Sequence, residues 1–318
     1  MSDAPFTPTR LVARALRTLT VDPQTHPRRQ PHLSAASGLV CAHQRAYVIA
    51  DDEHHLAVFR DVRSPGELHR VFAGDLPRPK NARKRIKPDL ETLLLLPSPD
   101  SATNGGALLA LSSGSGPNRN LGVMIALDTA GEPAAPARSF SLDPLYEPLR
   151  ERLGEINIEG ALLLGDQLVL LNRGVPGRSG NAVARYPLRE LFEVVAGRRL
   201  MLEPVSLRRY ELGTIDGVPL AFTDGTALPD GGGWLFSAVA ENTRSSYADG
   251  PCSGSVIGVV DGRGDLQALH RLALPFKVEG IAVNVDGYGT ALCLVTDADD
   301  PARSSQLLLA RLPATPAG

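Results

Sequence analysis

The sequence predicts an all-β fold, a five-bladed β-propeller with a central axial channel, on the basis of three observations. A short phrase recurs five times along the 318 residues, each occurrence leads into two further apolar segments, and one segment alone has helical periodicity. Strands and polar turns repeating at a period of about 50 to 70 residues are typical of propeller blades. We therefore expect residues 1–318 to form a single propeller domain.

The recurring phrase is a Ser or an acidic residue, usually followed by Gly, and then a short apolar run. Its intervals are 54, 68, 65 and 55 residues, and we expect it to form the innermost strand of each blade. The five copies begin at Ser37-Gly-Leu-Val, Glu91-Thr-Leu-Leu, Glu159-Gly-Ala-Leu, Asp224-Gly-Thr-Ala and Glu279-Gly-Ile-Ala. The two longer intervals and the first 30 residues leave a sixth, divergent blade open.

Each phrase is followed by a polar turn, a second apolar strand, a polar loop and a third strand. In the first repeat these segments are AYVIA, the loop at residues 51–55 and LAVF. The second and third strands of the other repeats are ALLALS and LGVMIALD, LVLLN and AVARYPL, WLFSAVA and SVIGVVD, and ALCLV and QLLLARL. This order of elements is what a blade requires.

Two segments outside the repeat also have an expected place. Residues 10–21 (RLVARALRTLTV) alternate well enough to form an outer strand that closes the ring with the C-terminal blade and removes an exposed sheet edge. Residues 187–197 (PLRELFEVVAG) have apolar side chains at helical spacing and end at Gly, which predicts a helix inserted in the third blade.

The polar residue that starts each inner strand should point into the mouth of the channel. Four carboxylates gathered there raise one another's pKa unless a cation compensates them, and calcium accepts six to eight oxygen ligands. We therefore expect one axial Ca²⁺, although hydrogen bonds from these residues to neighbouring strands are the alternative. The predicted metal ligands are Ser37, Glu91, Glu159, Asp224 and Glu279.

The same segments carry a family resemblance. SAASGLV with AYVIADD, IKPDLETLLLL, NIEGALLL, FTDGTALP and KVEGIAV resembles the calcium-dependent apyrases, whose five-bladed propeller holds one central calcium. The axial residues of that family run Ser, Glu, Glu, Ser, Glu, so Asp224 departs from its pattern in the fourth blade. IEGALLLGDQLVLLNRG is also similar to phytase-like esterase domains and to related bacterial propellers of unknown function. The resemblance covers residues 33–312 and implies the fold and the central ion.

Basic residues precede the second inner strand and follow several second strands, so we expect them around the same mouth. No acidic residue lies between Pro77 and Pro88. Arginine suits bidentate contact with phosphate or carboxylate, so the pattern predicts an anion site, with a solvated loop as the alternative. The predicted anion-binding residues are Arg83, Lys84, Arg85, Lys87, Arg119, Arg173, Arg178, Arg244 and Lys277.

Together these features predict a metal-dependent hydrolase of a phosphorylated or other anionic small molecule. The ion would polarise the scissile group, and Glu159 or Glu279 would serve as the base. A non-catalytic binding propeller with a structural calcium and a metal-assisted esterase or lactonase are the alternatives.

Two acidic loops are candidates for a secondary site. The loop Asp51-Asp52-Glu53-His54-His55 could supply a base or a second metal site, but an exposed loop tip is the simpler interpretation. Asp297, Asp299 and Asp300 could hold a peripheral cation, although the rest of an EF-hand loop is absent.

Composition and charge argue against a nucleic-acid-binding protein and against a membrane protein. The formal net charge of −2 recruits neither nucleic acid nor a membrane surface, and 5% aromatic residues offer no stacking module for single strands. No apolar run approaches the length of a membrane span, and the N-terminus lacks a signal-peptide pattern. Three widely spaced cysteines fit a reducing compartment. We expect a cytoplasmic protein whose partner is a small anionic molecule.

Overall fold

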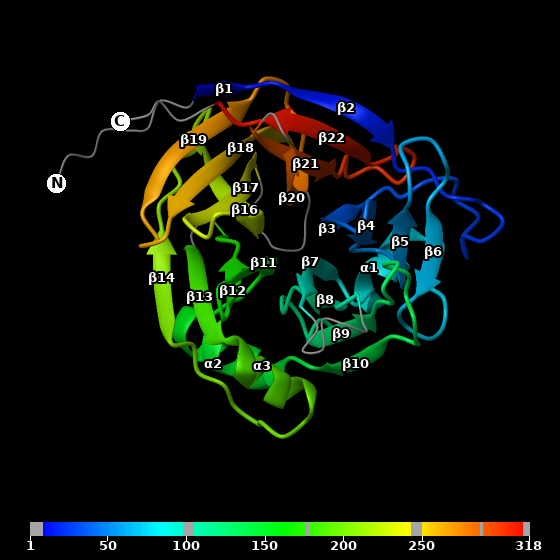
Figure 1. Cartoon of the computed structure of the whole chain (residues 1–318), viewed down its shortest axis with the longest axis horizontal. Coiled ribbons are helices and arrows are strands. Elements are labelled where there is room, and N and C mark those ends of the chain that lie inside the picture. The colour runs from blue at the N-terminus through cyan, green and yellow to red at the C-terminus, as the bar shows by residue number, and fades with distance from the viewer. Residues whose placement is uncertain (1–8, 98–104, 176–178, 243–249, 287–288, 314–318) are drawn as a thin grey trace.

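Five β-sheets surround one axis, which confirms the predicted five-bladed propeller (Figure 1). The structure is a computed structural model that describes residues 9–97, 105–175, 179–242, 250–286 and 289–313. In the first three blades the strands follow one another outward from the inner strand in chain order, each antiparallel to the one before. The described residues form five blades, so the sixth blade left open by the sequence is not present among them.

The first three blades each contain four strands. The first contains β3 (Ala36–Ala42), β4 (Arg45–Ala50), β5 (His55–Phe59) and β6 (Glu67–Arg70). The second contains β7 (Leu90–Leu96), β8 (Ala107–Ser112), β9 (Leu121–Ala126) and β10 (Arg138–Ser141). The third contains β11 (Ile158–Leu164), β12 (Gln167–Asn172), β13 (Asn181–Pro187) and β14 (Ser206–Tyr210).

The last two blades both take a strand from the N-terminal segment. The fourth contains β15 (Thr214–Ile215), β16 (Val218–Ala227), β17 (Gly233–Glu241), β18 (Cys252–Asp261), β19 (Leu266–Leu272) and β1 (Thr9–Leu11). The fifth contains β20 (Val278–Asp286), β21 (Gly289–Thr296), β22 (Gln306–Arg311) and β2 (Ala13–Thr18).

The N-terminal segment closes the ring as the sequence predicts. Strand β2 pairs antiparallel with β22 as the outermost strand of the fifth blade, and β1 pairs parallel with β19 of the fourth (Figure 1). Arg17 on β2 also lies over the ring of Phe59 in the first blade, 4.5 Å from its centroid. The N-terminal segment therefore contacts the fourth, fifth and first blades and joins the two ends of the ring.

Apolar side chains fill the spaces between adjacent blades. One of these clusters joins blades three and four around Trp234, Phe222 and Phe236, which are fully buried. The inner strands also approach one another closely. A Cβ on Gly160 of β11 would lie 2.8 Å from the Cα of Asp224 on β16, so a larger residue has no room there.

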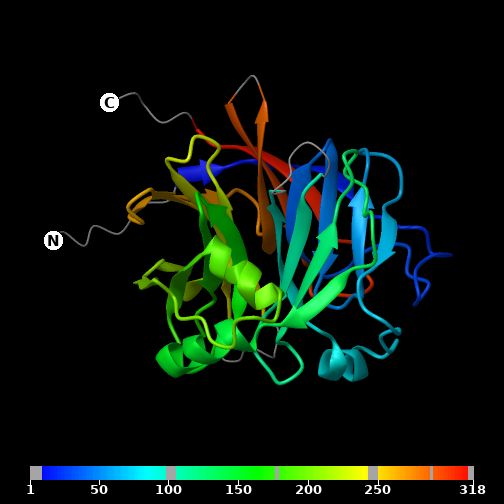
Figure 2. The ribbon, with the colours of Figure 1, turned by 60° about the horizontal axis from the view of Figure 1, so that its bottom comes forward.

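Three helices lie in the loops. Helix α3 (Leu188–Val195) follows β13 and confirms the predicted insertion in the third blade. The sequence did not predict α1 (Lys80–Ile86) or α2 (Asp143–Leu153), because α1 is a short basic segment and α2 contains Pro144 and Pro148. Figure 2 shows α1 (cyan) and α2 (green) at the same end of the ring, where β7 and β11 begin. None of the described helices has the length and apolar character needed to cross a bilayer.

Candidate functional site

A cavity of about 140 Å³ opens on the axis at the end of the ring where α1 lies. Its walls come from the starts of inner strands, the loops that follow second strands, and α1 itself. Ten acidic and seven basic side chains line it, so ionisable groups dominate its surface. The concave site with many converging charges is the strongest candidate for function.

A β-bulge interrupts every inner strand at the same level and positions the axial side chains. At each bulge the register with the second strand shifts by one residue. Bulges re-aim a side chain, and here they present one residue per blade toward the axis. The bulged residues are Ser37, Glu91, Glu159, Thr223 and Glu279.

The fourth blade differs from the sequence prediction by one residue. Thr223 occupies the bulge, while Asp224 takes the position that Gly160 and Gly280 hold in other blades. The Asp224 carboxylate is buried and accepts hydrogen bonds from the backbone N–H groups of Gly225 and of Ile281 in the next blade, at 2.7 and 2.9 Å. Asp224 thus ties inner strands together and does not line the cavity, which corrects its assignment as an axial ligand.

The two axial hydroxyl residues also join blades. The Ser37 hydroxyl donates to the carbonyl of Leu90 at 2.7 Å, and the Thr223 hydroxyl donates to the carbonyl of Val278 at 2.8 Å. In both cases the acceptor precedes the bulged glutamate of the next blade. Both hydroxyl residues therefore tie strands together, and Ser37 also lines the cavity with the three axial glutamates.

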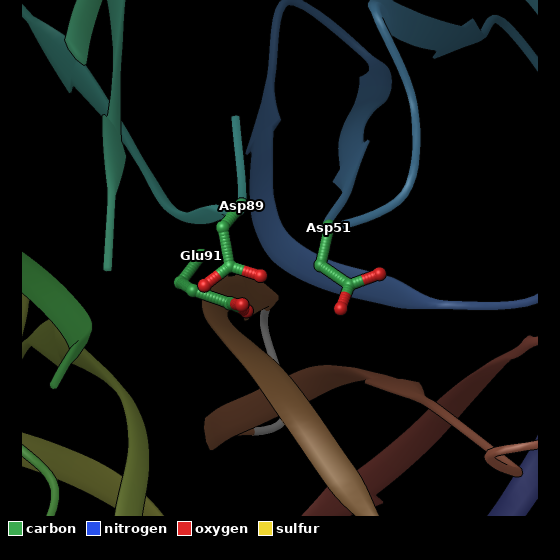
Figure 3. Close-up of side chains that lie close together, drawn as sticks. All are labelled: Asp51, Asp89 and Glu91. Carbon is green, nitrogen blue, oxygen red and sulfur yellow. The ribbon is translucent and has the colours of Figure 1, made fainter. Parts of the chain in front are cut away.

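Three carboxylates from two blades converge at one side of the cavity. Asp51 follows β4, Asp89 precedes β7 and Glu91 occupies the bulge of β7; one oxygen from each lies within 4.8 Å of the others. Figure 3 shows Asp89 and Glu91 side by side, with Asp51 facing them from the first blade. Among the described residues, Asp51, Asp89 and Glu91 are the one group of three whose ligand atoms lie this close.

The three carboxylates have different partners. Asp89 contacts Arg119 at 2.8 Å and Lys87 at 2.7 Å, whereas Asp51 has Lys87 as its ion-pair partner among the described residues. Within the described chain, the Glu91 carboxylate has neither a hydrogen bond nor an ion pair. Burial, together with the charges of Glu159 and Asp89, raises the pKa of Glu91 well above its usual range. Of the axial residues, Glu91 therefore has the carboxylate that a bound proton or cation would stabilise most.

Glu159 is held by polar neighbours at the next bulge. Asn157 Nδ2 donates to Glu159 Oε1 at 2.5 Å, and Arg173 Nη1 lies 3.6 Å from Oε2. Burial raises the pKa of Glu159 to about 7, with Glu279 adding to the effect and Arg173 opposing it. Arg173 also pairs with Glu241 at 2.5 Å. Glu159 can therefore exchange a proton near neutral pH.

The third axial glutamate shares its surroundings with an ammonium group. Lys277 Nζ lies 3.2 Å from Glu279 Oε1 and 2.7 Å from Asp299 Oδ1. Burial raises the pKa of Glu279, and Lys277 partly offsets the shift. Of the loop considered as a peripheral cation site, Asp297, Asp299 and Asp300 all line this same cavity.

The predicted anion-binding residues fall into three groups. Arg85 is exposed on α1 and does not line the cavity, and Arg178 and Arg244 lie outside the described residues. The remaining six line the cavity, and each already has a partner. These are Arg83, Lys84, Lys87, Arg119, Arg173 and Lys277.

Sequence reasoning missed Asp89, Asn157 and Glu241 and undervalued Asp51. The missed signal is positional. Asp89 and Asn157 each precede a bulged glutamate by two residues, where their carbonyls accept the N–H of the residue after the second strand. The equivalent bond in the first blade joins Ala35 and Asp51, which brings Asp51 to the mouth.

The fold and site define the class: a five-bladed β-propeller with a charged axial cavity. The model of a family of unknown function (DUF6929) matches residues 32–312, and the chain belongs to this family. No curated protein matches the chain.

Solved structures share the architecture at low identity. An α-L-arabinofuranosidase from Podospora anserina, in complex with cellotriose, is 11% identical with a TM-score of 0.51, covering 99% of this chain and 100% of that one. An endo-arabinase from Bacteroides thetaiotaomicron is 9% identical with a TM-score of 0.50, covering 94% and 99%. A calcium-binding regucalcin from Agrobacterium tumefaciens is 10% identical with a TM-score of 0.45, covering 95% of both chains. At these identities the likeness shows the fold alone.

Proposed function

We propose that the axial cavity binds one calcium ion and that the protein is a metal-dependent hydrolase of a small anionic molecule. The observation that carries the proposal is the convergence of Asp51, Asp89 and Glu91, with oxygens within 4.8 Å of one another. Carboxylate oxygens suit Ca²⁺, which tolerates irregular coordination. The site fits the ion further because Glu91 is without a protein partner among the described residues.

The charges around the site also favour a cation. Among the described residues, the lining has ten acidic and seven basic side chains, whose formal charges sum to −3. A divalent cation would offset the burial and the carboxylate repulsion that together raise the pKa values of Glu91 and Glu159. Glu159 and Glu279 would stabilise the ion from the neighbouring bulges.

The five residues at the bulges resemble the axial residues of the calcium-dependent apyrases more closely than the five residues predicted from the sequence do. With Thr223 at the fourth bulge, the series runs Ser, Glu, Glu, Thr, Glu, and a hydroxyl residue stands where that family has Ser. The resemblance implies one central calcium.

In the proposed reaction, a bound calcium ion supplies Lewis-acid polarisation of the scissile group. Glu159 would accept a proton from water, because its pKa of about 7 without the ion is lowered by a nearby cation and the carboxylate is then ionised at neutral pH. Asn157 and Arg173 orient the Glu159 carboxylate, and Lys277 holds Glu279 beside it.

One observation favours a second candidate, an esterase or lactonase acting on an uncharged substrate. All seven basic side chains of the cavity have partners within the protein. An anion would have to compete with these partners, whereas an uncharged ester would not.

The test combines metal content with turnover. We expect about one calcium per chain in the wild type, loss of calcium in Glu91→Gln, and retention in the matched control Glu147→Gln, which changes an exposed glutamate on α2. Glu159→Gln should lower calcium-dependent turnover by about 100-fold or more.

Nitrophenyl phosphate, nucleotides, a nitrophenyl ester and a lactone would serve as substrates. Turnover of the uncharged compounds alone would select the second candidate. Calcium without turnover of any compound would identify a non-catalytic binding propeller, and the absence of calcium at millimolar concentrations would refute the proposal.

A further inference from the structure

The ammonium group of Lys87 stands among the carboxylates of the proposed calcium site. Its Nζ lies 2.7 Å from Asp89 Oδ1 and makes a still shorter contact with Asp51 Oδ2. The Lys87 side chain is only 8% exposed. Asp51 and Asp89 are two of the three carboxylates whose oxygens converge, so this lysine is the positive charge that compensates them in the structure.

Lys87 lies at the end of α1, which forms part of the cavity wall. It follows α1 directly, and its backbone N–H caps that helix by donating to the carbonyl of Arg83 at 2.8 Å. Lys80, Arg83 and Lys84 of α1 line the cavity. The four-carbon stem of a lysine allows its ammonium group to turn toward solvent while its backbone stays in place.

An ammonium group and a divalent cation cannot share the same carboxylate oxygens. At separations of a few ångströms in a partly buried site, like charges repel strongly. Calcium held by Asp51, Asp89 and Glu91 must therefore displace the Lys87 ammonium from Asp51 and Asp89.

We propose that Lys87 is the resident cation of this site and that calcium binding expels its ammonium group toward the cavity mouth. The inference rests on the proposed calcium site. The displacement also explains how the cavity could bind an anion, although each of its basic side chains has a partner. After displacement, the Lys87 ammonium group would face the cavity mouth beside Lys84. Calcium binding would then precede anion binding.

Calcium affinity tests the inference directly. By isothermal titration calorimetry, Lys87→Met should bind Ca²⁺ at least 10-fold more tightly than the wild type, because no ammonium group has to be displaced. Arg85→Met is the matched control. It removes one positive charge from α1 at an exposed side chain that does not line the cavity, and its affinity should change by less than about 3-fold.

The outcomes separate the two proposals. Equal or weaker calcium binding by Lys87→Met, with the wild type binding calcium, overturns the role of Lys87 alone. If Lys87→Met binds calcium and the wild type does not, the Lys87 ammonium group occupies the site permanently. This result would overturn both the displacement of Lys87 and the proposed function. No binding by any of the three proteins overturns both proposals.

A second measurement uses the unaltered protein and does not depend on the variant folding. Acetic anhydride modifies accessible amines, and mass spectrometry reports the modification at each lysine. Lys87 should be protected without calcium and become several-fold more reactive with it, while exposed Lys80 reacts equally in both. An unchanged reactivity of Lys87 in calcium-loaded protein would contradict the displacement.

Discussion

Arg83 and Arg85 stand two positions apart on α1 and have opposite surroundings. Arg83 is buried, with Nε 2.9 Å from Asp52 Oδ2 and Nη1 donating to the carbonyls of Pro77 and Arg78. Arg85 is exposed. The sequence placed both in one anion-binding run, because a basic segment does not reveal which side chain turns inward.

The first prediction compares these two residues. Arg83→Ala should lower the free energy of unfolding by about 3 kcal/mol or more, since it leaves the buried carboxylate of Asp52 without this partner. Arg85→Ala should change it by less than about 0.5 kcal/mol. Urea denaturation measures both, and equal effects would contradict the assignment of Arg83 as a structural residue.

His55 gives a prediction for pH. It is buried at the start of β5, and desolvation, with the nearby charge of Arg70, lowers its pKa from 6.5 to about 4, although Glu53 Oε2 lies 3.9 Å from its Nδ1. The folded protein therefore favours the neutral imidazole, and protonation favours the unfolded chain. This contribution to stability is complete above pH 6.5 and is lost as the pH falls toward 4.

The measurement is Tm against pH. We expect the wild-type Tm to fall between pH 6.5 and 4, and the fall to be smaller in His55→Gln. The same slope in both proteins would show that other groups control the acid sensitivity.

At the scale of the element, the repeated bulge decides which residue of each inner strand faces the axis. Four of the five axial residues could be predicted, because a polar residue followed by an apolar run marks the bulge. In the fourth blade Asp224-Gly225 resembles Glu159-Gly160 in sequence, but the bulged residue is Thr223, one position earlier. A register shift of one residue is set by strand pairing, which the local sequence does not contain.

Asp224 provides the prediction at this scale. Asp224→Ala should cost about 3 kcal/mol or more, because the buried N–H groups of Gly225 and Ile281 lose their acceptor. Thr223→Val, which removes one hydroxyl, should cost about 1 kcal/mol. Urea denaturation and metal analysis measure the effects, and loss of calcium in a folded Asp224→Ala protein would return Asp224 to the ligand set.

At the scale of the molecule, the cavity exists only when the ring is closed. Asp51 comes from the first blade, Asp89 from the second, Arg173 from the third and Lys277 from the fifth. The sequence predicts the blades from local periodicity, but the pairing of Lys87 with Asp51 depends on how neighbouring blades meet. The axial glutamates could therefore be predicted, whereas the cations between them could not be assigned their partners.

The last prediction concerns ring closure. A chain lacking residues 1–18 loses β1 and β2, which exposes the edges of β19 and β22. We expect this chain to aggregate or to lose its cooperative thermal transition, and a synthetic peptide of residues 9–21 to restore it. A chain lacking only residues 1–8 is the control, and unfolding of the shorter chain at the full-length Tm would contradict the role of the closure.

The closure also has a consequence for biosynthesis. A ribosome makes β2 long before it makes its partner β22, because β3 to β21 lie between them in the sequence. The earlier blades can fold during translation, but β2 must wait for almost the whole chain. Throughout that interval its unpaired backbone is open to other chains, and Arg14 and Arg17 place positive charge on the waiting strand. The order of synthesis thus leaves β2 without its partner strand for longer than the inner strands of the blades, which pair with the next strand along the chain.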